Sequence, residues 1–114
     1  IKNSEIDEIS YIEPAYHQAL KMLQISLQSY SDSSTELALE VLSMDTDLSK
    51  FHKQATKTYT KRLEEPCDHY KTYLNLVFIV RWIERVGDLA TNIAEDVIFM
   101  QSAQDIRHGG DLED

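Results

Sequence analysis

Acidic side chains recur near residue 90 at intervals that match the turns of an α-helix. Glu84, Asp88 and Glu95 are four and seven residues apart, and Asn92 lies one step off their line. On a helix these side chains share one side. Two or three carboxylates in such a row could ligate a hard cation, but these ions prefer about six or more oxygen ligands, which one helix rarely supplies. A solvated acidic face is the alternative that the spacing leaves open.

An apolar repeat marks the helix that must carry these acids. Apolar residues recur every seven positions, and a second series follows each of them by three: Leu76, Ile83, Ala90 and Val97, then Ile79, Val86, Ile93 and Met100. Such heptads predict a helix packed nearly parallel to its neighbours in a bundle, with the acids pointing outward. Gly87 costs about 1 kcal/mol relative to Ala within a helix, so its presence predicts close approach by a neighbouring helix.

The first of two upstream helices is expected to begin near residue 11. Ser10 and Glu13 form a capping-box pattern, and Pro14 is tolerated in a first turn, where amides lack helical partners. Apolar residues then recur at three- and four-residue spacing as far as Tyr30. Residues 1–10 are either a linker or an extension of this helix.

A second capping-box pattern, formed by Ser33 and Glu36, predicts another helix that ends near residue 63. Pro66 then breaks the chain before the third helix begins. Residues 104–114 are aperiodic and include adjacent glycines, which predicts a C-terminal tail after a bundle that spans residues 11–103.

Composition favours one all-α domain. The chain has 114 residues, only three Gly and two Pro, and a formal charge of −9. Three amphipathic helices joined by short loops predict an up-down-up antiparallel three-helix bundle. The acidic balance argues against nucleic acid as a partner, and the chain contains no apolar stretch long enough for membrane insertion. The single Cys67 cannot close an intrachain disulfide, so we expect a cytoplasmic location.

Three large apolar residues lie outside the core repeat of the third helix. Phe78 and Trp82 are one turn apart, and Leu89 follows on the same side. These residues are either a partly buried flank of the bundle or a surface that packs against a further helical unit. We predict a homodimer through this surface.

The acidic segment also carries a family resemblance. Residues 81–95 contain the patterns Glu-Arg-x-Gly-Asp and Asn-Ile-x-Glu, and the chain continues to Asp105-Ile106-Arg107-His108. Both stretches resemble the PhoU family, whose members usually carry two three-helix repeats, and the whole chain resembles the C-terminal repeat of a protein about twice as long. The resemblance implies a non-enzymatic cytoplasmic regulator that restrains phosphate uptake by contacting the phosphate ABC transporter and a phosphate-sensing histidine kinase.

The resemblance also implies a metal site, because iron, zinc or other metals are associated with an acid and an Asp four residues later in each repeat. Glu84 and Asp88 match that motif. In the second helix Asp45 takes the first position, and Ser49 stands where the family usually has Asp. His52, seven residues after Asp45, could serve as a nitrogen ligand. We therefore expect at most a weakened iron or zinc site.

Two other classes of function compete with this interpretation. An enzyme of the ferritin-like type needs Glu-x-x-His pairs, which the sequence lacks, and Cys67 with His69 is the one thiol and imidazole pair to consider. We therefore predict no catalysis. The stronger alternative is a generic acidic helical protein-protein interaction domain with no metal role.

Overall fold

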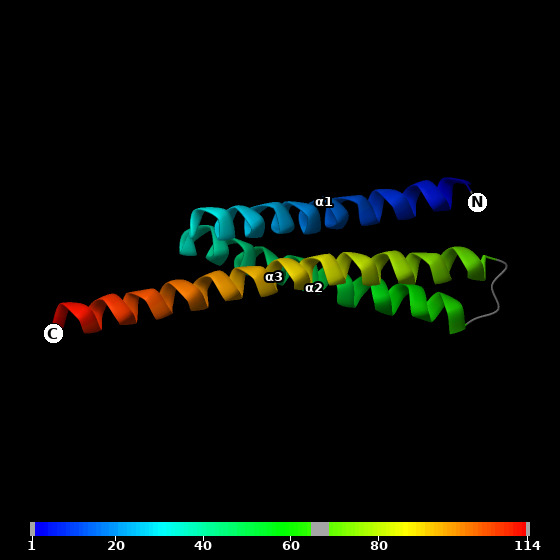
Figure 1. The fold of residues 1–114 in the computed structure, drawn as a ribbon. Helices are drawn as coiled ribbons and strands as arrows, with labels where there is room; N and C mark the ends of the chain where they lie inside the picture. The colour runs from blue at the N-terminus through cyan, green and yellow to red at the C-terminus, as the bar shows by residue number, and fades with distance from the viewer. Residues whose placement is uncertain (1, 65–68, 114) are drawn as a thin grey trace.

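The computed structural model describes residues 2–64 and 69–113, and within these ranges the chain forms three α-helices (Figure 1). The helices are α1 (Lys2–Asp32), α2 (Thr35–Glu64) and α3 (Tyr70–Glu113). Each runs in the direction opposite to that of the helix before it, which confirms the all-α, up-down-up three-helix bundle.

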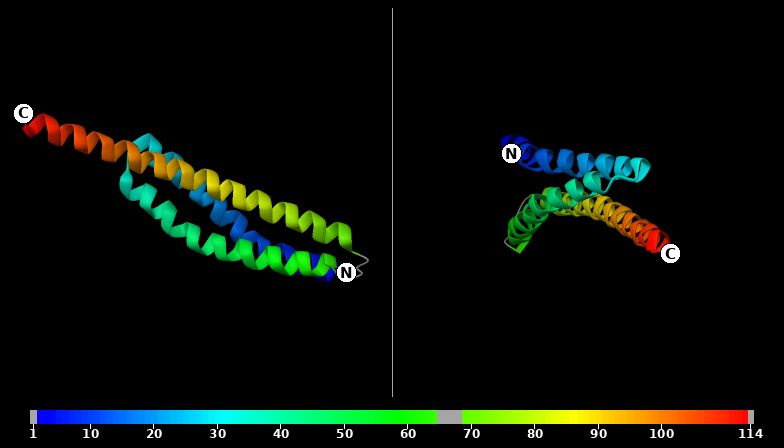
Figure 2. Two further views of the ribbon diagram at one scale, coloured as in Figure 1. Left: turned by 90° about the horizontal axis from the view of Figure 1, so that it is seen from below. Right: turned by 90° about the vertical axis from the view of Figure 1, so that its left-hand side faces the viewer.

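The bundle is long and narrow, with extents of 71 × 22 × 16 Å. The interface between α2 and α3 is the most extensive, and α1 packs against both of these helices. The C-terminal part of α3 projects beyond the turn that joins α1 to α2 (Figures 1 and 2). None of the helices, over the described residues, is both long and apolar enough to cross a membrane.

The turn between α1 and α2 shows how the sequence reverses the chain in two residues. Ser33 adopts a left-handed backbone with φ of 53°, and the amide of Ser34 donates to the carbonyl of Ser29 at 2.8 Å. This six-to-one bond is the pattern that closes many helix C-termini. The Ser34 hydroxyl then accepts from the amide of Leu37 at 3.1 Å, so Ser34 caps α2 one residue later than the capping-box pattern predicted.

The start of α1 differs from the prediction made on its capping pattern. The helix begins at Lys2, so residues 2–10 are a helix extension and Pro14 lies inside the helix. Proline cannot donate a hydrogen bond to the carbonyl of Ser10. Ser10 and Pro14 are both exposed, so water can reach that carbonyl. The capping-box pattern, which would also suit a helix start, therefore lies within a continuous helix.

Residues 104–113 are helical, whereas the sequence had indicated an aperiodic tail. Residues 102–107 are exposed and lie on the part of α3 that projects from the bundle. This segment contains no proline, and the penalty of about 1 kcal/mol for each glycine does not stop a helix already initiated by the bundle. At residues 104–107 the lack of apolar periodicity therefore reports an exposed helix rather than the end of the helix.

The core lies along the shared axis of the three helices. The first apolar series of α3 is buried as predicted, with exposures of 7% or less at Leu76, Ile83, Ala90 and Val97. Part of the second series is exposed, 44% at Ile79 and 40% at Met100. Its place in the core is taken by residues four positions after the first series, which are Val80, Gly87 and Ala94. Two of these three are small, which lets the other helices approach α3 closely.

Candidate functional site in the seam between α2 and α3

Four residues that the sequence singled out meet in one place. Asp45 and His52 of α2 face Glu84 and Asp88 of α3 across a small pocket of about 30 Å³. Leu48 and Ser49 complete its lining. A volume of this size has room for a single ion or about one water molecule.

The two helices meet closely here because Gly87 has no side chain. A Cβ atom built on Gly87 would lie 2.5 Å from Cδ2 of Leu48 and 4.0 Å from Oδ1 of Asp45. The predicted close approach at Gly87 is therefore present, and the Leu48 side chain of α2 makes it. The contact fixes the register that brings the acids of α3 opposite the polar residues of α2.

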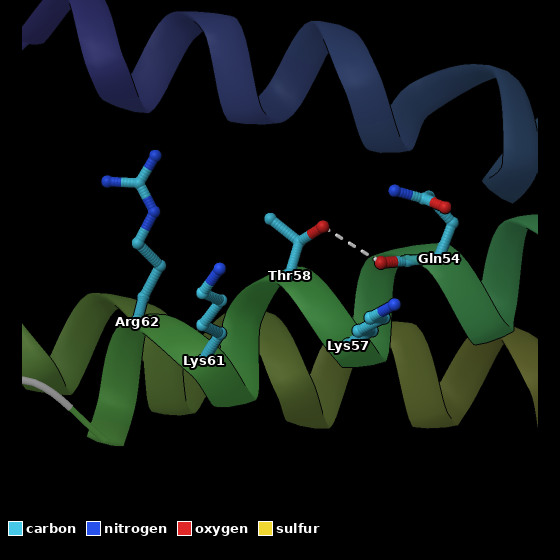
Figure 3. A pocket seen from close by; sticks show the side chains of 5 residues that line it. All are labelled: Gln54, Lys57, Thr58, Lys61 and Arg62. Carbon is cyan, nitrogen blue, oxygen red and sulfur yellow. Dashed lines mark hydrogen bonds between the residues drawn. The ribbon is translucent and has the colours of Figure 1, made fainter.

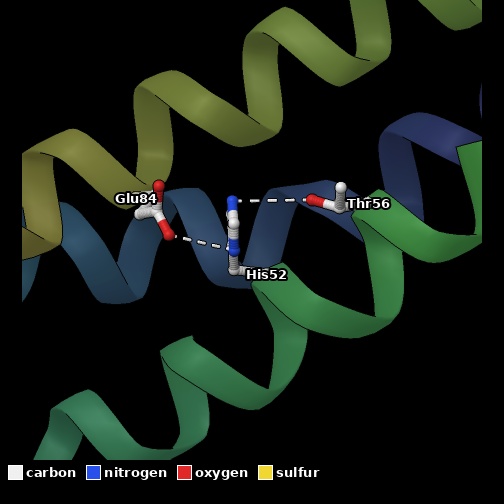
Figure 4. A network of polar contacts seen from close by, with 3 residues as sticks. All are labelled: His52, Thr56 and Glu84. Carbon is white, nitrogen blue, oxygen red and sulfur yellow. Dashed lines mark hydrogen bonds and ion pairs between the residues drawn. The ribbon is translucent and has the colours of Figure 1, made fainter. Parts of the chain in front are cut away.

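His52 and Glu84 form the direct contact across the seam (Figure 4). Nδ1 of His52 lies 3.0 Å from Oε2 of Glu84, and the two side chains are 24% and 40% exposed. Nε2 of the same ring lies 3.5 Å from Oγ1 of Thr56, one turn further along α2. When the imidazole is neutral, Nδ1–H can donate to the carboxylate while Nε2 accepts from the threonine hydroxyl. The ring is thus held in one orientation from both sides.

These donors do not form a metal centre as they are arranged. Among the described residues, no group of three or more His, Cys, Asp and Glu side chains converges closely enough to hold a metal ion. His52 is engaged by Glu84, and Ser49, at the position where the resemblance implies Asp, brings a neutral hydroxyl that cannot balance the charge of a cation. Iron or zinc binding therefore stays a prediction, and no step of the function proposed below runs through a metal.

Some polar residues of α2 and α3 lie outside the seam. Asp45 faces α3, whereas Asp47 lines a different pocket, between α1 and α2, as expected for residues about 160° apart on a helix. Glu95 and Asn92 are exposed and do not line the seam pocket. Thr91, three residues after Asp88, is 9% exposed and its hydroxyl donates to the backbone carbonyl of Asp88 at 2.9 Å.

Comparison with known proteins assigns the family. The model of the PhoU domain matches residues 12–97, a range that contains the whole seam pocket. The chain belongs to the PhoU family. A comparison with solved structures finds no match.

Relatives of this PhoU-family chain are named phosphate-specific transport system accessory protein PhoU homologues. The relative from Pseudomonas aeruginosa is 33% identical over 93 residues, 82% of this chain and 38% of its own length. Homologue 1 from Methanothermobacter thermautotrophicus is 33% identical over 79 residues, 69% of this chain and 36% of its own length. Homologue 1 from Thermotoga maritima is 21% identical over 103 residues, 90% of this chain and 44% of its own length. The chain thus spans about two fifths of the length of these relatives.

A second feature of this PhoU-family chain is the exposed apolar face of α3. Phe78, Trp82 and Leu89 are 52%, 65% and 51% exposed, so they are not a buried flank of the bundle. The guanidinium of Arg85 lies 5.9 Å from the ring centre of Trp82, within the range of cation–π attraction. Together with Arg81, these aromatic and arginine side chains line a pocket of about 220 Å³. The dimer interface stays a prediction, and the three apolar residues proposed for it are accessible to a partner.

A polar contact between α1 and α2, which no local sequence pattern indicates, lies near the start of α1. Tyr59 is fully buried, and its hydroxyl donates to Oε2 of Glu8 at 2.5 Å. Burial, then the hydrogen bond and charge of Glu8, raise the pKa of Tyr59 well above its ordinary value. No local pattern joins two residues 51 positions apart, and the expectation of a helix start near residue 11 had placed Glu8 outside the bundle.

Proposed function

We propose that this chain is a regulatory unit of a phosphate-transport accessory protein. The observation that carries the proposal is the match of the PhoU domain to residues 12–97, because the relatives that share this domain are named as accessory proteins of phosphate-specific transport. In this proposal the chain acts in the cytoplasm as a non-enzymatic adaptor. It acts negatively on the phosphate ABC transporter and on signalling through a phosphate-sensing histidine kinase.

The described structure supports an adaptor through its surfaces. The chain carries a formal charge of −9, and Asp88 and Glu95 are exposed on α3. Exposed charge steers association and sets orientation more than it adds affinity. The apolar residues Phe78, Trp82 and Leu89 could supply the affinity, because buried aromatic side chains dominate most interfaces.

We further propose that a second three-helix unit covers this aromatic face. The relatives are more than twice as long as the segment that they share with this chain, so a further unit is available in proteins of this family. In the isolated chain a second copy takes that place and gives a homodimer. Trp82, at 65% exposure, is the residue whose burial contributes most.

A second candidate function follows from the arrangement of donors in the seam. Because no three candidate ligands converge within the described residues, the chain can also act as an acidic helical interaction domain with no metal role. The two candidates share the adaptor activity and differ in the partner, which is the phosphate-transport system in the first and a basic protein outside that system in the second.

Copurification with the transporter tests the proposal. The chain is bound to a resin and exposed to detergent extracts of cells that contain a phosphate ABC transporter, with an unrelated ABC transporter as the control. We expect retention of the phosphate transporter and a marked loss of retention in Phe78→Ala/Trp82→Ala, whereas Leu39→Ala, which removes an exposed apolar side chain from α2, should retain it. Equal retention of both transporters would refute the proposal.

A further inference from the structure

Basic residues are concentrated in one half of α2, although the chain as a whole is acidic. The segment 48–63 contains five of the eleven basic residues and no acidic residue, whereas the formal charge of the chain is −9. Its basic residues are Lys50, Lys53, Lys57, Lys61 and Arg62, and all five are exposed. We call this set the basic patch.

The patch faces one side of the helix. Lys50, Lys53, Lys57 and Lys61 follow one another at intervals of three, four and four residues, which aligns them over about 16 Å of α2. Like charges at this spacing destabilise a helix by about 0.2–0.5 kcal/mol for each pair. No ion pair to any of these lysines is found among the described residues, so the repulsion is left uncompensated there.

The helix dipole accounts for only part of the patch. Cations stabilise the last turn of a helix, which explains Lys61 and Arg62. The effect fades within one turn, so it gives no reason for Lys50, Lys53 and Lys57. Arg62 also lies 5.8 Å from the ring centre of Tyr73, within the range of cation–π attraction. A negatively charged ligand that lies along the row of lysines would explain Lys50, Lys53 and Lys57.

Part of the patch is concave. Lys57, Lys61 and Arg62 line a pocket of about 490 Å³ together with Gln54 and Thr58 (Figure 3). The pocket opens on α2 beneath α1, and the labelled side chains extend from α2 into it. Its described lining contains three cations, one amide and one hydroxyl, and the threonine hydroxyl donates to the carbonyl of Gln54 at 2.9 Å. The three positive charges of the described lining favour an anion.

The lining distinguishes between kinds of anion. Protein interfaces are depleted in lysine and enriched in aromatic residues, and the described lining has two lysines and no aromatic residue. A long polynucleotide would extend past the patch over the acidic remainder of the chain. A guanidinium fork beside two ammonium groups suits phosphoryl oxygens, and the volume lies in the usual range for a small ligand.

We propose that the pocket of the basic patch binds a short anion that carries several phosphoryl groups. Such groups occur in a free oligophosphate and in clustered phospholipid headgroups. The site lies apart from the seam pocket and from the aromatic face of α3, so the proposal does not depend on the function proposed above.

Two binding measurements on the 114-residue chain test this site and identify the source of the anion. Sodium tripolyphosphate is titrated calorimetrically at about 0.15 M salt, where the screening length is about 8 Å, and vesicles of phosphatidylcholine with and without phosphatidylglycerol are used in co-sedimentation at the same salt. Each measurement is repeated with Lys57→Glu/Lys61→Glu and with a control of the same charge change, Lys21→Glu/Arg107→Glu. All four residues are exposed, so circular dichroism should show unchanged helicity in both variants.

We expect the patch variant to bind about 100-fold more weakly, because each charge-assisted hydrogen bond contributes roughly tenfold. The control should lose less than about threefold, as expected for charges beyond the screening length. The arm in which wild-type binding occurs identifies a free or a lipid-borne anion. Absence of binding in both arms, or equal losses in the two variants, would overturn the proposal.

Discussion

Replacement of Gly87 by Ala tests whether α2 and α3 meet as closely as the seam requires. The new Cβ would lie 2.5 Å from Cδ2 of Leu48, whereas carbon atoms in contact are about 3.5–4.0 Å apart. One of the two groups must therefore move by about 1 Å. Leu48 is only 4% exposed, but it borders the seam pocket and a pocket of about 200 Å³ between α1 and α2, so a shift of its terminal methyl can relieve part of the clash.

The expected effect combines two opposing terms. Overpacking of a core costs about 1–3 kcal/mol, and the change from Gly to Ala within a helix gains about 1 kcal/mol. Gly87→Ala should therefore lower the free energy of unfolding by about 0–2 kcal/mol. In a chain with Leu48→Ala the obstruction is absent, and the same change should raise stability by about 1 kcal/mol.

A double-mutant cycle measures the difference. Urea denaturation followed by far-ultraviolet circular dichroism gives the four free energies of unfolding, and the coupling between the two positions should be about 1–3 kcal/mol. Leu48→Val replaces Leu48→Ala if the larger truncation prevents folding. If Gly87→Ala stabilises the wild-type and truncated chains equally, α2 and α3 are not in contact at Gly87 and the account of the seam is wrong.

Three further outcomes are expected. Tyr59→Phe should destabilise the chain by about 1–2 kcal/mol in urea denaturation at neutral pH, through loss of a hydrogen bond to a carboxylate. Because folding raises the pKa of Tyr59, the stability that its hydroxyl contributes is complete below about pH 10 and is lost as the pH rises above it. The variant should therefore lose less stability from pH 9 to 11 than wild type, and identical pH profiles would contradict this. Sedimentation equilibrium should show a dimer that Trp82→Ala dissociates, and a monomer in both chains would rule out the proposed interface. If iron or zinc binds, Glu84→Ala/Asp88→Ala should abolish retention of the metal by the protein on desalting. The stability of the metal-free variant should change by less than about 1 kcal/mol, because neither side chain is buried. Retention of metal by the variant would place the metal elsewhere.

The sequence predicted the fold because local signals and long-range packing agree. Few glycines and prolines, three amphipathic segments and short connections leave an antiparallel bundle as the simple solution. The heptad of α3 correctly identified one half of its buried stripe. It failed at Ile79 and Met100 of the other half, because positions three and four residues after a core residue lie on either side of it, and only the neighbouring helices decide which side is covered.

The ends of the helices were harder to predict from local patterns. The residues from Ser10 to Glu13 match the preferences of a helix start, yet α1 begins earlier, at Lys2. The contact between Glu8 and Tyr59 favours this N-terminal extension. At the other end of the chain, α3 continues as far as Glu113, although residues 102–107 are exposed. Capping patterns and periodicity report preferences within one turn, and tertiary contacts override them.

The candidate site was predicted in its residues but only partly in its arrangement. Asp45, which takes the first position of the motif, lines the seam, and His52 meets Glu84 there. Sequence spacing on one helix cannot give the rotation of the facing helix. It therefore could not show whether the donors converge, which is the property that decides between a metal centre and a polar seam.

The rate of phosphate uptake under phosphate excess is the most direct test of whether the chain restrains phosphate transport. The chain is produced in a bacterium from which the gene of its own PhoU-family protein has been deleted, and the entry of radiolabelled phosphate is measured with Phe78→Ala/Trp82→Ala as the comparison. We expect the chain to lower uptake and the variant, present at the same level, to do so less. Uptake that is unchanged by folded, accumulated chain would contradict this expectation.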